Sequence, residues 1–275
     1  MATEIETGTS ELLASLDEGV LTLTMNRPEA RNAMTGPMTA ALAGALARAE
    51  LDRAVRCIVL TGSGGAFSGG GDVKAMAASG DGTVGDDTID GAIHRQRINQ
   101  QATSGKLFTI PKPTIASLPG AAAGGGLALA LACDLRIMAS TAFLTTAFAR
   151  VGFSGDYGGS YFLTQLVGSA KARELYYLSD RVGAEEALRL GLTNWVCADD
   201  ELATATRDVA RRLAAGPTVA YRYMKENLNR AMSGGDLDDC LDLEVTHHIH
   251  CGQTEDHREA TKAFVAKRQP VFHGR

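Results

Sequence analysis

The sequence predicts an α/β fold, because short runs of strand composition alternate with segments of helical spacing along the first half of the chain. Residues 19–25 and 55–61 are apolar runs of strand character, and the alanine-rich segment 35–51 between them has helical spacing. The run over 55–61 is compact and β-branched, which is typical of a buried strand. This β-α-β order indicates an α/β core.

The first strand, over 19–25, is expected to end at the Asn-Arg-Pro tripeptide of residues 26–28. The residue before a proline is driven out of the helical region, so the strand stops cleanly there. Two more strands are predicted over 114–117 and 134–138. A glycine triplet and an alanine- and leucine-rich helix over 127–132 lie between them.

From residue 169 onward the pattern becomes mainly helical. We therefore expect two regions, a core over 1–198 and a helical C-terminal region over 199–275. A segment rich in Gly, Asp, Ser and Thr, over 77–91, is expected to be a mobile loop on the way into the site. Helices are predicted over 170–178, 184–190, 199–215, 218–232, 236–250 and 255–268.

Composition limits the classes of function. The chain has 275 residues, 45% of them hydrophobic, and a net charge of -5, which argues against a general polyanion binder such as a nucleic-acid protein. No apolar run is long enough to span a bilayer, and the N-terminus lacks the pattern of a signal peptide, so a cytoplasmic location is expected. Five scattered cysteines indicate reduced thiols rather than a disulfide framework or a zinc ribbon.

Two glycine-rich segments, over 67–72 and 120–126, each place bare backbone at the end of an apolar run. Glycine adopts positive φ easily and lets a ligand approach main-chain N–H groups without a Cβ in the way. Each segment on its own is compatible with a simple tight turn. Together they indicate an anion-binding site in which one N–H from each segment forms an oxyanion hole.

A larger set of motifs occurs in order along the chain and covers roughly residues 10–272. The motifs are residues 26–34, 66–76, 112–116, 124–126, 133–134, 158–163, 184–192, 263–264 and 267–268. The chain resembles the enoyl-CoA hydratase/isomerase (crotonase) family. This resemblance implies a spiral of β-β-α units with a helical C-terminal trimerisation region. It also implies acyl-CoA thioesters as ligands, a homotrimer or dimer of trimers, and no metal or cofactor beyond the coenzyme A of the substrate.

Carried over position by position, the resemblance implies that Gly71 and Gly125 supply the two N–H groups that bind the thioester oxygen. Gly125 lies just before the predicted helix, whose positive N-terminal end adds to the stabilisation of an oxyanion. The chain departs from the hydratase pattern at the two positions where hydratases carry glutamates, which are here Ala128 and Phe148. Neither side chain can accept a proton, so simple hydration is disfavoured.

One carboxylate, Asp156, lies four residues after Gly152. Several isomerases of the family are similar to this chain here, because they carry Asp or Glu at the corresponding position. A single carboxylate suffices to move a double bond, by removing a proton from C2 of a 3-enoyl-CoA and returning it at C4. A pocket lined by residues such as Phe148, Phe153 and Leu144 would raise the pKa of Asp156 by desolvation. Two alternatives are that Asp156 caps the helix starting near Gly158, or that it is a nucleophile as in the family's aromatic acyl-CoA dehalogenases.

Cationic and apolar residues that resemble the family's CoA-contacting positions are expected to bind the substrate. These positions are Arg27, Arg31, Lys74, Phe148, Phe264 and Lys267, the last two acting across subunits.

Other polar residues are expected to take no part in the reaction. Asp72 and Asp134 are expected to be structural, and the histidine-rich segment 247–251 is expected to be surface rather than a metal site. The glycines of residues 62–65 do not form a dinucleotide fingerprint, which leaves a nicotinamide enzyme as a weak alternative. The predicted function is thus an enoyl-CoA isomerase using Asp156. One alternative is an enoyl-CoA hydratase or another reaction of the family. A second alternative is a catalytically silent acyl-CoA binder or RNA-associated subunit.

Overall fold

The computed structural model describes residues 2–79 and 88–275 of the chain. The predicted loop over 77–91 therefore falls largely outside the described residues, and helices α2 (Val73–Ser79) and α3 (Ile89–Gln100) lie on either side of it. Within the described residues, no helix is both long and apolar enough to cross a membrane.

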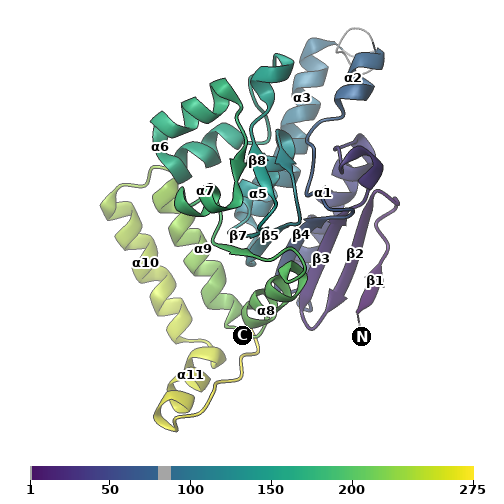
Figure 1. Cartoon of the computed structure of the whole chain (residues 1–275). Coiled ribbons are helices and arrows are strands. Elements are labelled where there is room, and N and C mark those ends of the chain that lie inside the picture. Colours follow the sequence, from purple (N-terminus) through teal and green to yellow (C-terminus); the bar gives the residue numbers. More distant parts are fainter. Residues whose placement is uncertain (1, 80–87) are drawn as a thin grey trace.

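The fold is built on a sheet of seven strands in the order β1-β2-β3-β4-β5-β7-β10 (Figure 1). The first three strands pair antiparallel, and from β3 onward every neighbouring pair is parallel. A second, smaller sheet has the order β6-β8-β9. The strands of the large sheet are β1 (Thr3–Ile5), β2 (Leu12–Asp17), β3 (Val20–Met25), β4 (Cys57–Gly62), β5 (Thr114–Leu118), β7 (Leu135–Ala139) and β10 (Trp195–Cys197), and those of the small sheet are β6 (Ala122–Ala123), β8 (Phe143–Thr145) and β9 (Val182–Gly183).

The predicted strands and helices are confirmed, and their ends shift by three residues at most, except for the helix predicted over 170–178. Helix α1 (Gly36–Leu51) begins after Thr35, whose side chain accepts a hydrogen bond from the Met38 amide, and it buries Met38, Leu42 and Leu46 against the sheet. Helix α5 (Gly125–Ala132) starts two residues earlier than predicted, and every one of its residues is buried. Its small side chains allow close packing on all sides.

Helix α6 (Gly159–Leu178) is longer than predicted, because two helical segments join across a kink at Gly168. The remaining helices are α4 (Lys106–Thr109), α7 (Ala184–Arg189), α8 (Leu202–Ala214), α9 (Thr218–Met232), α10 (Leu237–Gly252) and α11 (Glu255–Val265), with a π-helical turn at Gln101–Gly105 between α3 and α4.

Strands β1 and β2 were not predicted from the sequence. The segment of β2 alternates buried and exposed residues only at its start, and it contains no β-branched or aromatic residue. Its position is set by antiparallel pairing with β3, which covers all six residues of each strand.

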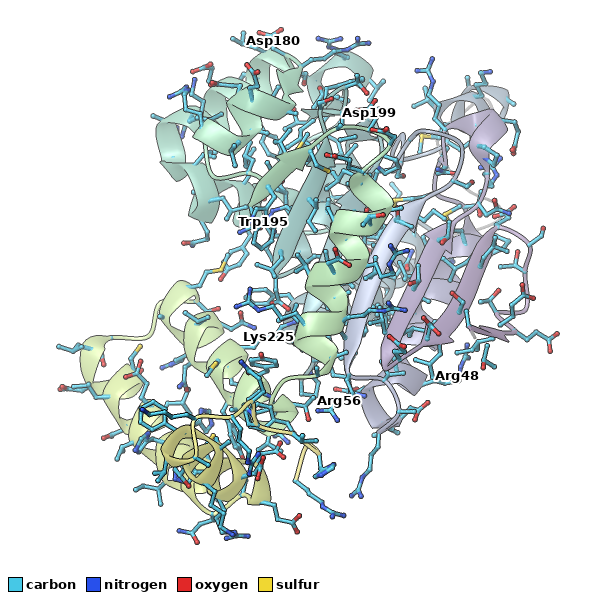
Figure 2. The ribbon with its side chains drawn as sticks, turned by 60° about the horizontal axis from the view of Figure 1, so that its bottom comes forward. Arg48, Arg56, Asp180, Trp195, Asp199 and Lys225 are labelled. Atoms are coloured by element: carbon cyan, nitrogen blue, oxygen red, sulfur yellow. The ribbon has the colours of Figure 1, made fainter. Side chains whose placement is uncertain are left out.

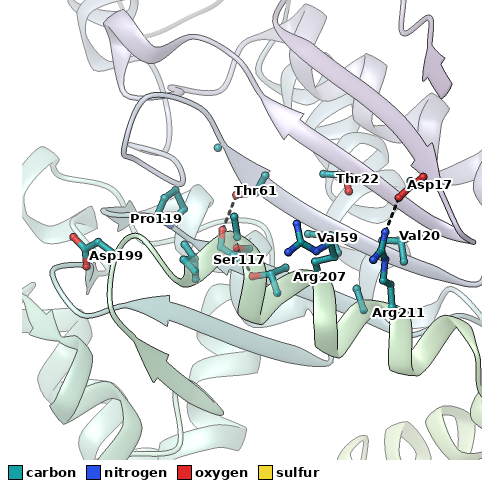
Figure 3. Close-up of a pocket in the computed structure, with 15 residues that line it drawn as sticks. Asp17, Val20, Thr22, Val59, Thr61, Ser117, Pro119, Asp199, Arg207 and Arg211 are labelled. Carbon is teal, nitrogen blue, oxygen red and sulfur yellow. Dashed lines mark hydrogen bonds and ion pairs between the residues drawn. The ribbon is translucent and has the colours of Figure 1, made fainter. Parts of the chain in front are cut away.

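Helix α8 lies along one face of the large sheet, whereas α9, α10 and α11 extend away from it (Figures 1 and 2). The Thr206 hydroxyl of α8 is 2.8 Å from the Ser117 hydroxyl of β5. A cavity of about 430 Å³ lies between α8 and the strands β3, β4 and β5 (Figure 3). The predicted division of the chain at residue 198 remains a prediction.

A buried lysine joins α9 to the core. The Lys225 ammonium donates hydrogen bonds to the carbonyls of Leu107 (2.9 Å) and Lys112 (3.2 Å), and it pairs with Asp134 at 2.9 Å. Asp134 also accepts from the Thr114 amide and hydroxyl. The prediction that Asp134 is structural is therefore confirmed, and Figure 2 shows Lys225 where α9 meets the core.

We expect Lys225→Met to lower the free energy of unfolding by about 3 kcal/mol, because it leaves a carboxylate and two buried carbonyls without their donor. Lys171→Met is the control, since that lysine forms an ion pair with Glu174 in which the two side chains are 32% and 51% exposed. It should cost less than about 1 kcal/mol. Urea unfolding followed by circular dichroism measures both, and equal losses would contradict the structural role of Lys225.

Candidate active site

The two glycine-rich segments lie side by side, although they are far apart in the sequence. The amides of Phe67 and Ser68 donate to the carbonyl of Ala121 at 3.0 and 3.1 Å, and the Ala123 amide donates to the Ser68 carbonyl at 2.9 Å. This backbone pairing brings the segments together as predicted.

Glycine is required where the two segments touch. Gly70 has φ +84°, and a methyl group built on it would lie 2.7 Å from the Ala123 carbonyl oxygen and 3.4 Å from the Gly125 nitrogen. A methyl on Gly126 would collide with Ser68, at 2.5 Å from its Cβ. The close approach of the two backbones therefore depends on missing side chains.

The two predicted oxyanion donors lie on the facing ends of these segments. Gly125 is the first residue of α5, so its N–H has no acceptor one turn earlier within the helix. Gly71 pairs with Met34 in a short parallel bridge. It directly follows Gly70, the residue whose added methyl would lie 3.4 Å from the Gly125 nitrogen. A main-chain N–H group at a helix N-terminus, such as that of Gly125, is suited to an oxygen that carries negative charge.

Asp156 lies next to this position. A methyl group built on Gly125 would come within 3.1 Å of Asp156 Oδ1. That oxygen is buried and has no hydrogen-bond partner among the described residues. Burial raises the pKa of Asp156 to about 6, as expected for a carboxylate without compensating donors.

The alternative that Asp156 caps the next helix is wrong. Helix α6 has Gly158 at its N-cap position and no side-chain capping bond. The Asp156 main-chain carbonyl accepts from the Gly159 amide at 3.0 Å, but this bond does not involve the carboxylate.

Aromatic side chains surround the carboxylate. Phe148 lies beside Gly124, whose added methyl would be 3.7 Å from the Phe148 ring, and Phe148 stacks on Tyr176 with ring centroids 5.8 Å apart. Tyr157 is buried, and a methyl on Gly125 would be 3.1 Å from its ring. Phe153 does not enclose the site as expected, because its side chain is 54% exposed.

A chain of polar contacts holds Tyr157. Its hydroxyl accepts from the Asn99 side chain at 3.0 Å, and its amide donates to the Gln100 side chain at 2.6 Å. Its backbone has φ +49°, an uncommon value for a tyrosine. These contacts from α3 fix the segment that carries Asp156. Sequence analysis missed Tyr157, Tyr176, Asn99 and Gln100, because no local pattern links them to the glycine segments.

The two positions that carry glutamates in hydratases contribute no carboxylate. Ala128 is fully buried on α5, and a methyl built on Gly159 would lie 3.3 Å from the Ala128 Cβ. Phe148 packs against Tyr176 and Gly124.

Arg27 is bound to Asp72, the residue that follows the first predicted oxyanion donor, Gly71. Its guanidinium donates to the Ala33 carbonyl at 2.9 Å and pairs with Asp72 at 3.1 Å. The Asp72 carboxylate also accepts from the Ala75 amide at 3.1 Å. That amide and Arg27 hold the pKa of Asp72 below its usual range. Asp72 therefore stabilises the start of α2, which confirms its structural role.

The other predicted substrate-binding residues are divided between two places. Arg31 and Lys74 are exposed and belong to the segments around Gly71. Phe264 is 85% exposed on α11, and Lys267 follows that helix by two residues. Figure 1 shows α11 well apart from α5. The predicted contact of both residues with the substrate of a neighbouring subunit stays a prediction.

The expectation of a surface-exposed histidine segment is wrong for His247. It is buried, lies 2.5 Å from the Asn227 side-chain oxygen through Nδ1, and stacks on Tyr223 with ring centroids 4.2 Å apart. It pairs with Glu226 at 3.3 Å. His247 thus joins α10 to α9.

We expect Asp156→Asn to stabilise the folded protein at pH 8. The folded state binds a proton at a pKa of about 6, above the value of about 4 in the unfolded chain, so ionisation of this carboxyl opposes folding at high pH. The gain should be about 1 to 3 kcal/mol at pH 8 and should shrink as the pH falls from 6 towards 4.

Urea unfolding of wild type and variant at pH 8 and pH 4.5 measures this gain. Asp180→Asn is the control, because Asp180 is 72% exposed, and it should change the free energy of unfolding by less than about 0.5 kcal/mol. A destabilising effect of Asp156→Asn at pH 8 would show that the carboxylate has partners in the folded state.

Comparison with known proteins identifies the family. The model of the enoyl-CoA hydratase/isomerase family matches residues 15–275. The chain is 36% identical to 1,2-epoxyphenylacetyl-CoA isomerase of Escherichia coli K12, covering 96% of this chain and 98% of the relative. It is 32% identical to short-chain-enoyl-CoA hydratase of Clostridium acetobutylicum, covering 91% and 92%.

Solved structures agree with this result. The crystal structure of an enoyl-CoA hydratase from Polaromonas sp. JS666 has a TM-score of 0.85 at 32% identity, covering 95% of this chain and 99% of that one. A crystal structure from Streptomyces coelicolor A3(2) has a TM-score of 0.91 at 34% identity, covering 100% and 98%. The predicted crotonase-like α/β fold is therefore confirmed, and the chain belongs to the enoyl-CoA hydratase/isomerase family.

Proposed function

We propose that this protein is an acyl-CoA enzyme that moves a double bond from C3 to C2 of an enoyl-CoA, with Asp156 as the only proton carrier. The observation that carries the proposal is a buried, unpartnered carboxylate oxygen directly beside Gly125. A general base is most effective when its pKa lies near the working pH. Burial raises the pKa of Asp156 to about 6, which brings it closer to neutral pH.

The reaction follows from these positions. The N–H groups of Gly71 and Gly125 bind the thioester oxygen, and Asp156 removes a proton from C2. The electron pair moves towards the thioester oxygen and forms a dienolate, whose negative charge the two N–H groups stabilise. The protonated Asp156 then returns the proton at C4, and the double bond ends between C2 and C3. No water is consumed.

Hydration receives less support. It requires a group that activates water in addition to the group that protonates the carbon chain. Ala128 and Phe148 occupy the positions from which hydratases supply their two glutamates. Relatives of the chain carry both kinds of name, among them a trans-2-decenoyl-[acyl-carrier-protein] isomerase of Streptococcus mutans at 32% identity.

The coenzyme A portion of the substrate requires cations for its phosphates. Arg31 and Lys74 are exposed near Gly71 and are proposed for this role. Arg27 contributes indirectly, because its guanidinium pairs with Asp72, the residue next to Gly71. Phe264 and Lys267 are proposed to contact the substrate of a neighbouring copy.

This arrangement requires an oligomer, and we propose a homotrimer or a dimer of trimers. Support comes from α10, where four apolar residues recur every four positions and remain exposed in the single chain. They are Leu237 (72%), Leu241 (51%), Val245 (56%) and Ile249 (60%). A helix face of this kind is typical of an interface between subunits.

The direct test is turnover of 3-hexenoyl-CoA and crotonyl-CoA by wild type and by Asp156→Asn. Wild type should form 2-hexenoyl-CoA, and the variant should lose at least about 100-fold in kcat/KM. Because Asp156 acts as a base, kcat/KM should fall tenfold per pH unit below about pH 6 and level off above it. Hydration of crotonyl-CoA would contradict the isomerase, and turnover of neither thioester would favour a silent acyl-CoA binder.

The oxyanion hole is tested by crowding, since a side-chain substitution cannot remove a main-chain N–H. Gly125→Ala places a methyl 3.1 Å from Asp156 Oδ1 and from the Tyr157 ring, so kcat should fall by about 100-fold or more. Gly36→Ala is a matched control, because Gly36 is also the first residue of a helix and its methyl would meet no atom within 4 Å. Normal activity of Gly125→Ala would show that substrate does not bind there.

A further inference from the structure

The cavity of Figure 3 lies outside the candidate active site. Its volume of about 430 Å³ is within the range of small-molecule sites, and Gly71, Gly125 and Asp156 do not line it. Its two long walls are helix α8 and the face of β3, β4 and β5 that α8 covers. The proposed reaction therefore leaves this cavity without a role.

Short side chains on both walls keep the space open. Ala203, Thr206 and Ala210 of α8 line the cavity, and they recur at the three- and four-residue spacing of one helix face. On the opposite wall, Thr22 of β3 and Val59 of β4 are neighbours in the parallel pairing of the two strands. Because these side chains are short, they do not fill the space between the helix and the sheet.

The lining combines apolar surface with a few hydroxyl groups. Val59 and Leu202 supply apolar surface from the two walls. The Thr61 hydroxyl donates to the Ser117 carbonyl at 2.9 Å. The Thr22 hydroxyl, in contrast, makes no hydrogen bond with any other described residue. Such a lining suits a hydrocarbon chain, and Thr22 offers one donor beside it.

The two arginines that line the cavity differ in their partners. Arg211 pairs with Asp17 at 3.1 Å and with Glu18 at 2.8 Å. Arg207 lies one turn earlier in α8 and donates to the Thr204 hydroxyl at 3.3 Å. Among the described residues, no carboxylate lies within ion-pair distance of the Arg207 guanidinium. Arg207 is thus a cation in the cavity wall whose charge is not balanced by a neighbouring carboxylate.

The carboxylates at the two ends of the cavity already have partners. Asp17 is in the ion pair described above, and Asp199 accepts hydrogen bonds from the Thr141 amide at 3.1 Å and the Ser140 hydroxyl at 3.0 Å. Bonds from Thr141 and Ser140 hold the pKa of Asp199 below its usual range. Figure 3 shows Arg207 in the middle of the cavity, between Asp199 at one end and Asp17 at the other. An anion in the middle of the cavity would therefore meet a cation.

We propose that this cavity binds a small carboxylate with an apolar chain, such as the anion of a medium-chain fatty acid. Arg207 binds the carboxylate, because guanidinium and carboxylate groups match in charge and in geometry. Val59 and Leu202 cover the chain, and the Thr22 hydroxyl is a further donor in the same cavity. The single unbalanced cation favours a monoanion. A phosphate monoester carries a larger charge, which one arginine does not balance.

This inference goes beyond the proposed function and does not depend on it. The acyl chain of a CoA thioester has no carboxylate, so the cavity selects the free acid, whereas the candidate active site is proposed to bind the thioester. The residues that distinguish the two sites are Arg207 in the cavity and Asp156 in the candidate active site.

The test is calorimetric titration of the full chain with octanoate, 1-octanol and octyl phosphate. Wild type should bind octanoate saturably and on the order of tenfold more tightly than 1-octanol, which has the same chain length and no charge. Arg207→Gln should weaken octanoate binding by at least about tenfold and remove the difference from 1-octanol. Arg212→Gln is the matched control, because Arg212 is exposed on the same helix and does not line the cavity. It should leave the octanoate affinity unchanged.

Ala203→Trp is a second variant, since Ala203 is exposed at the cavity and an indole there would occupy the space of the ligand chain. It should abolish binding of both octanoate and 1-octanol. The proposal is overturned if wild type does not bind octanoate saturably, if it binds octanoate and 1-octanol equally, or if octanoate binding survives in Arg207→Gln. Tighter binding of octyl phosphate than of octanoate would overturn the choice of a monoanion.

Butyryl-CoA separates this cavity from the candidate active site. The octanoate affinity of wild type should be the same with and without saturating butyryl-CoA. Displacement of octanoate by butyryl-CoA would place octanoate in the candidate active site and overturn the proposal. Wild type that fails to isomerise 3-hexenoyl-CoA but binds octanoate through Arg207 would refute the proposed function and support this inference.

Discussion

The backbone pairing between residues 67–68 and 121–123 is the contact on which the rest of the site depends. It joins the end of the β4 loop to the start of α5, so that the N-terminus of a fully buried helix faces the other glycine segment. Gly70 and Gly126 permit this approach because they lack side chains. Without it, the two glycine segments would not lie side by side, and the proposed oxyanion donors could not act together beside Asp156.

The proposed site combines main-chain N–H groups that could bind an anion with an uncompensated carboxylate. Asp156 Oδ1 is buried without a donor, and the surrounding aromatic residues exclude water from it. Such a group costs folding free energy, and this cost is what raises its pKa into the range of a useful base. The contacts that make the arrangement rigid lie elsewhere, in the Asn99 and Gln100 bonds to Tyr157.

The sequence predicted most elements of the fold and the pairing of the two glycine segments. Strand runs, alanine-rich helices and paired glycine segments are local signals, so β4, α1, α5 and the glycine pairing could be predicted. The family resemblance then pointed to Gly125 and Asp156. Strand β2 could not be predicted because pairing with β3 determines it, and Tyr176 could not because Phe148, Gly155 and Gly159 create its surroundings only after folding.

The central claim is that one carboxylate carries a proton from C2 to C4. The most direct measurement is the fate of deuterium in 3-hexenoyl-CoA labelled at C2, with the product analysed by mass spectrometry and NMR. The account predicts 2-hexenoyl-CoA in which a measurable fraction of molecules carries deuterium at C4, because the buried Asp156 exchanges slowly with solvent. A product with only solvent hydrogen at C4, or a 3-hydroxyacyl product containing solvent oxygen, would contradict it.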